Sequence, residues 1–172
     1  HGTFQMTQAK LLAAGDPYRS VAFYRMAKLG PGRMPRLGST VADRKGLKLI
    51  HDWIVGIPTS HPTGNLLDDW YHIAIGLNRL DAENLDEKAR NTLADGLLAT
   101  TSMASQTAWM VGEGKIKSKH RDLIIARARQ HVDGRIRDLF ERFLPEEKRT
   151  KRLGSVVRPE EILALNGNAE EG

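Results

Sequence analysis

The chain has 172 residues, 40% of them hydrophobic, which is enough for the cores of one or two small domains. No apolar run approaches the roughly 20 residues that cross a bilayer, so we expect no membrane span. The absence of cysteine excludes disulfides, thiolate zinc sites and a CxxCH haem-attachment motif within these residues.

The net charge is +5, and basic residues concentrate in 25–36 and 115–152. The second cluster alternates with acidic residues, as on a mixed helix surface. A nucleic-acid interface would be a denser patch of one sign, so nucleic-acid binding is not expected.

The stretch "GDPYRSVAFYRMAKLG", residues 15–30, predicts the first helix. Asp16 is suited to cap its free amide groups, and Pro17 is suited to the first helical position. Gly30 is expected to end this helix in a left-handed conformation. The constrained loop "GPGRMPRLGS", residues 30–39, follows.

A second helix is predicted over 43–55, because Leu47, Ile50 and Ile54 form an amphipathic stripe with Trp53 beside it. The stretch after it, "GIPTSHPTGN", is rich in proline, glycine and hydroxyl residues and indicates a linker. We therefore predict a domain over 1–57, a linker over 58–64 and a helical module over 65–172.

The helical module is predicted to contain several short helices joined by tight turns, which indicates an all-α bundle or a HEAT-like helical array. Ser118 and Asp133 are placed to cap two of them. The expected helical segments are 66–77, 85–97, 100–111, 119–131, 134–144 and 158–168.

No enzyme motif is found along the chain. None of the six histidines pairs with another at the i, i+4 spacing, and there is no HExxH, GxSxG or phosphate-binding loop. His51, in "LIHDWI", is interpreted as a core or surface histidine. The chain is not expected to catalyse a reaction by itself, although it could belong to a larger haem-containing oxidoreductase.

Met34 has two interpretations from its local sequence. A thioether on a loop stiffened by Pro31 and Pro35 can serve as an axial ligand of haem iron. A methionine in a turn more often fills a gap in the core. Local chemistry alone favours the second interpretation.

Residues 15–54, from "GDPYRS" through "GRMPRLGS" to "LIHDWI", resemble the last part of a haem-binding domain. That domain occurs in large secreted multidomain proteins of the planctomycete type and is similar to c-type cytochromes. The resemblance implies that Met34 is a haem and metal ligand, framed by Arg33 and Pro35. It also implies that the helix carrying Trp53 packs behind the haem edge.

Residues 137–172, beginning "RDLFERFLPEEKR", resemble the segment that leads into a second cytochrome c domain of the same proteins. In that family a CxxCH motif lies before the first matching segment and another after the second. This chain contains neither, so it is not expected to hold haem covalently by itself. Haem c is expected only if the upstream CxxCH half is present. The chain begins with His1 and is expected to be processed or cut from something longer.

The resemblance implies an all-α chain: the C-terminal part of a cytochrome c-like haem domain, then the helical module. The implied function is a non-catalytic segment between two haem sites of a periplasmic or secreted electron-transfer protein. Its partners would be haem-bearing flanking domains or a redox protein. The alternative is a helical-repeat scaffold without haem, whose Arg and Lys surface binds an acidic partner.

Overall fold

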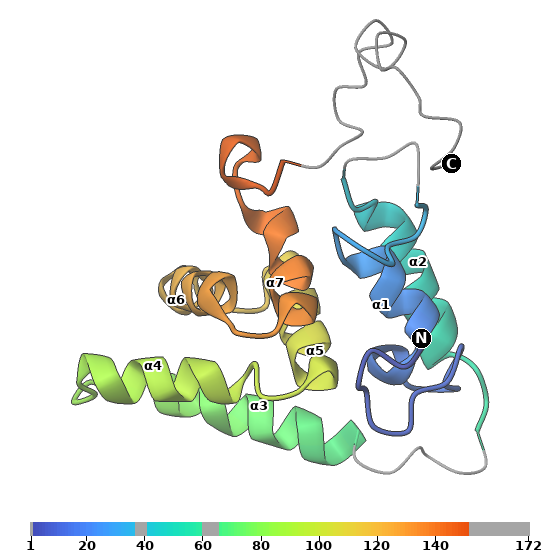
Figure 1. Ribbon diagram of the computed structural model, residues 1–172. Coiled ribbons are helices and arrows are strands. Elements are labelled where there is room, and N and C mark those ends of the chain that lie inside the picture. The colour runs from blue at the N-terminus through green and yellow to red at the C-terminus, as the bar shows by residue number, and fades with distance from the viewer. Residues whose placement is uncertain (1, 37–40, 60–65, 152–172) are drawn as a thin grey trace, which may run out of the picture.

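The structure is a computed structural model that describes residues 2–36, 41–59 and 66–151. Its described part contains seven α-helices and three short 3₁₀-helices, η1–η3, and no strand, which confirms the predicted all-α class (Figure 1). No helix among these residues is long and apolar enough to span a bilayer. The predicted helix over 158–168 lies outside the described residues.

The first predicted helix is divided in two. Asp16 caps the 3₁₀-helix η1 (Pro17–Arg19) through the amides of Tyr18 and Arg19, and α1 (Val21–Ala27) follows. Ser20 lies between them in an extended conformation, because its hydroxyl is held by the Ala13 amide and the Asp16 carbonyl. Serine competes for backbone partners in this way, and here it interrupts the helix.

The predicted helix over 43–55 is confirmed as α2 (Arg44–Val55). Asp43 caps it by accepting a hydrogen bond from the Lys45 amide. Leu47 and Ile54 are buried, as the stripe predicted. Trp53, beside this stripe, is 53% exposed.

Five helices follow and agree closely with the predicted segments. Asp86, Thr100 and Asp133 cap three of them through side-chain oxygens. The capping prediction for Ser118 is wrong: it is the first residue of its helix, and Lys117 precedes it without a side-chain cap. The helices are α3 (Leu66–Leu80), α4 (Glu87–Gly96), α5 (Thr101–Gly112), α6 (Ser118–Gln130) and α7 (Gly134–Phe140).

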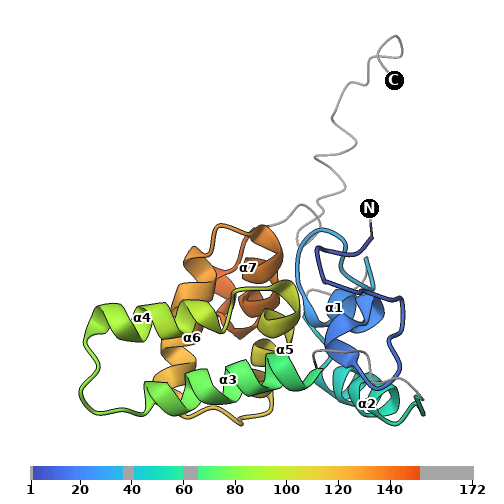
Figure 2. The same ribbon diagram turned by 90° about the horizontal axis from the view of Figure 1, so that it is seen from below.

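Figures 1 and 2 show α3 and α4 lying side by side, with α1 and α2 paired at the other end of the molecule. Helix α5 contacts α3, α7 and η1, and ten of its residues are buried. It is therefore the central helix, against which both ends of the molecule pack. The 3₁₀-helices η2 (Glu141–Phe143) and η3 (Glu146–Lys148) follow α7.

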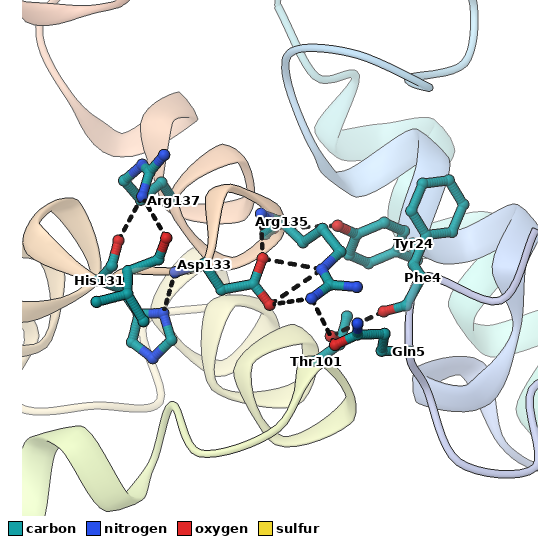
Figure 3. Close-up of polar contacts among 9 residues, drawn as sticks. Phe4, Gln5, Tyr24, Thr101, His131, Asp133, Arg135 and Arg137 are labelled. Carbon is teal, nitrogen blue, oxygen red and sulfur yellow. Dashed lines mark hydrogen bonds and ion pairs between the residues drawn. The ribbon is translucent and has the colours of Figure 1, made fainter. Parts of the chain in front are cut away.

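One buried hydrophobic cluster extends across both predicted domains, from Phe23 and Leu47 on the first side to Trp109 and Phe140 on the second. Polar contacts join the same two parts (Figure 3). Tyr24 donates its hydroxyl hydrogen to the Arg135 carbonyl across 3.0 Å. Residues 1–57 and the module after residue 65 thus pack on each other, and the predicted linker falls largely on residues 60–65, outside the described part.

Candidate functional site

The loop that carries Met34 is fixed to α1 and its C-cap by one backbone hydrogen bond and two side-chain hydrogen bonds. The Met34 amide donates to the Arg25 carbonyl across 2.8 Å. Arg25 Nε donates to the Gly32 carbonyl across 2.8 Å, and Lys28 Nζ donates to the Pro31 carbonyl across 2.6 Å. These three contacts hold the loop against the helix that precedes it, as a ligand-bearing loop requires.

The same loop is fixed to α7 through Asp138. Lys28, whose side chain is only 2% exposed, forms an ion pair with Asp138 Oδ2 at 2.8 Å. The Leu29 amide donates to the Asp138 carbonyl across 3.0 Å. Gly30 is left-handed, with φ +81°, as predicted, and a Cβ there would come within 2.6 Å of Asp138 Oδ1. Only glycine allows the loop this close to α7. The helix itself ends earlier than predicted, at Ala27, because Lys28 is extended towards Asp138.

Met34 lies on the surface. Its side chain is 39% exposed and does not belong to the hydrophobic core, so it does not fill a gap there. Arg33 is half-buried and Pro35 is exposed on either side of it. Trp53 lies on α2, and no described hydrogen bond or ring contact joins it to this loop. The structure therefore places Arg33, Met34 and Pro35 together on one fixed loop, and Trp53 on a separate element.

Among the described residues, the Met34 loop fits the role of a single axial ligand. Within the described residues, no group of three His, Cys, Asp or Glu side chains converges as a metal site. An exposed thioether on a fixed loop can supply one soft ligand to a metal held by other residues. Because the chain has no cysteine, the covalent anchoring of a haem would have to come from another segment.

His51 is the centre of a second feature, an aromatic cluster. Its ring stacks on Trp109 of α5 at 4.2 Å between centroids. Nδ1 lies 3.0 Å from Asp52 Oδ1, so Nε2 can accept the hydroxyl hydrogen of Tyr18, also at 3.0 Å. Burial lowers the pKa of His51, although the hydrogen bond to Asp52 opposes this shift. The interpretation of His51 as a core or surface histidine agrees with this half-buried, bonded ring.

Beside this cluster lies a groove of about 290 Å³, lined by His51, Tyr18, Trp70 and Gln106 among others. Gln106 is buried on α5, and its Oε1 accepts no hydrogen bond from the described residues. The spacing of apolar residues along the sequence did not indicate that Gln106 and Trp109 belong to a site. Helix α5 is buried on nearly every side, so it has no distinct apolar face. The available signal was the complete lack of charged residues over 97–112.

Comparisons with known protein families, with curated proteins and with solved structures found no match for this chain. What the chain does must therefore be argued from its own residues and geometry, together with the motifs quoted above.

Proposed function

We propose that this chain is a non-catalytic segment of a c-type cytochrome-like electron-transfer protein, and that Met34 supplies an axial ligand to a haem c. One observation carries the proposal: the Met34 side chain is 39% exposed on a loop fixed to both α1 and α7. A partly exposed thioether on a fixed loop is accessible to a metal that another segment holds, and a thioether is a soft ligand that suits haem iron.

The residues of this chain orient the thioether. Arg25 and Lys28 hold the backbone on the N-terminal side of Met34. Pro31 and Pro35 restrict the backbone φ angles around it. A fixed loop lowers the entropy lost when the sulfur binds, which favours ligation. When bound, a haem with an axial methionine carries one electron at a raised reduction potential.

The partners and location follow from the same proposal. The haem would be anchored by a CxxCH segment upstream of this chain, and the partners would be haem-bearing flanking domains or a redox protein. The protein would be periplasmic or secreted, like the c-type proteins whose motifs it resembles.

The alternative, a scaffold whose basic surface binds an acidic partner, fits the charges less well. Lys117, just before α6, forms an ion pair with Asp81 at 2.6 Å, and Lys119 on α6 forms one at 3.4 Å. Arg127 makes two hydrogen bonds of 2.7 Å with Asp95. Part of the basic charge at α6 is therefore neutralised within the chain.

The proposal is tested on the protein that joins this chain to an upstream CxxCH segment, produced with haem attached. Met34→Leu removes the thioether and keeps the side chain's size, so we expect a changed absorption spectrum and a lower reduction potential. Met26→Leu, a half-buried position that packs against the core, is the matched control. A spectrum and potential unchanged by Met34→Leu would refute the proposal.

A further inference from the structure

Three arginines from separate elements line one cavity. Arg44 begins α2, Arg142 lies in η2, and Arg149 directly follows η3. With Val41 and Ala42 they enclose about 150 Å³. This is about ten times the space that one water molecule needs, so a small polyatomic ligand can enter.

Arg142 is the innermost of the three. Its Nη2 donates to the Ala108 carbonyl at 3.2 Å, and its guanidinium lies 4.7 Å from the centre of the Phe143 ring. Its Nε is buried and has no hydrogen-bond partner among the described residues. A buried donor without a partner is costly, so Arg142 is held in this position by the rest of the fold. Burial, and then the neighbouring Arg44, lower the pKa of Arg142 to about 10, so its charge persists at pH 7.

The positive charge around the cavity is not balanced by an ion pair. Arg44 donates to the Gly112 carbonyl, and Arg149 donates to the carbonyls of Leu144 and Arg142. None of these three arginines forms an ion pair with an acidic side chain in the described ranges 2–36, 41–59 and 66–151.

Two carboxylates lie in the neighbourhood. Glu113 is near enough to raise the pKa of Arg142, although this effect is smaller than those of burial and Arg44. Glu141 Oε1 accepts the Thr150 amide at 2.6 Å. Two carboxylates cannot balance three guanidinium groups in full, and like charges brought together in this way repel unless an anion joins them.

We propose that this cavity binds a small oxyanion, a phosphate or a carboxylate group. Guanidinium groups match such oxygens in a forked geometry with charge-assisted hydrogen bonds. The bound oxyanion would remove the repulsion between Arg142 and Arg44. This site is separate from Met34, and the proposal that it binds an oxyanion does not depend on the haem proposal.

The test is calorimetric titration of the full chain with inorganic phosphate and, separately, with acetate, at constant ionic strength held by chloride. Arg44→Gln and Arg149→Gln each remove one guanidinium near the surface, so folding should persist and is checked by circular dichroism. Arg129→Gln, an exposed position on α6 outside the cavity, is the matched control.

We expect saturable binding of at least one of the two anions, weakened about tenfold or more by Arg44→Gln and by Arg149→Gln, and unchanged by Arg129→Gln. Tighter binding of phosphate than of acetate would identify a phosphate ligand, and the reverse order a carboxylate ligand. The proposal is overturned if neither anion binds, or if the control variant weakens binding as much as the two cavity variants.

Discussion

The amide of Met34 donates a hydrogen bond to the carbonyl of Arg25 across 2.8 Å, so the proposed ligand loop turns back onto the helix from which it emerges. The Arg25 side chain holds the same loop a second time, through the Gly32 carbonyl. The position of Met34 therefore depends on a residue nine positions earlier.

Arg25→Gln should loosen the loop with little change in global stability. It removes the guanidinium contact with Gly32, an exposed hydrogen bond that contributes about 0.5–1 kcal/mol. We expect faster hydrogen exchange at the Met34 amide and an unchanged rate in α5, both measured by NMR. An unaltered Met34 exchange rate would show that the Arg25 side chain does not restrain the loop.

Tyr24→Phe should weaken the contact between α1 and α7. The variant removes the hydroxyl that donates to the Arg135 carbonyl at 3.0 Å (Figure 3). We expect the free energy of unfolding to fall by about 1 kcal/mol, measured by urea denaturation. Tyr71→Phe, at a position 59% exposed, is the control and should change stability much less. Equal losses in both variants would contradict the structural role of Tyr24.

Asp138→Asn should be strongly destabilising. It removes the charged partner of Lys28, whose ammonium group is buried between the loop and α7. Breaking a buried ion pair on one side typically costs about 3 kcal/mol. Asp122→Asn, on the exposed surface of α6, provides the control in the same denaturation experiment. A loss no larger than the control's would mean that Lys28 is solvated in the protein.

Stability should fall on acidification below about pH 6.5 because of His51. Burial lowers its pKa in the folded protein below the ordinary value of 6.5, so the unfolded chain binds a proton more readily than the folded one. The folded state is therefore favoured above pH 6.5 and loses that advantage as the pH falls towards the folded pKa. His51→Gln should reduce the difference in unfolding free energy between pH 7 and pH 5.5, whereas His72→Gln, an exposed residue, should not. An identical pH dependence in both variants would remove His51 as the cause.

Local signals in the sequence were sufficient for most of the helices. Asp43, Asp86, Thr100 and Asp133 each cap the helix that follows, because a short polar side chain before an apolar stretch satisfies free amides wherever it occurs. The break at Ser20 could not be predicted, since it depends on partners at Ala13 and Asp16 that the fold brings into place.

The two candidate sites were harder to predict from the sequence than the helices, because they depend more on tertiary contacts. The sequence indicated Met34 through its neighbours in a proline-rich loop, but it could not show that Asp138 holds that loop from more than 100 positions away. The arginine cavity was missed for the same reason. Arg44 and Arg142 are far apart in the chain, and no sequence motif contains both of them.

The most direct measurement is methyl NMR of the haem-loaded protein in its reduced state, with methionine methyl groups labelled with ¹³C. A methionine bound to low-spin haem iron lies over the ring, whose current shifts the methyl signal strongly upfield. The proposal predicts one such signal among the five methionines of this chain, and its loss in Met34→Leu but not in Met26→Leu. An upfield methyl signal that persists in Met34→Leu, or no shifted signal from this chain, would contradict the assignment of Met34 as the axial ligand.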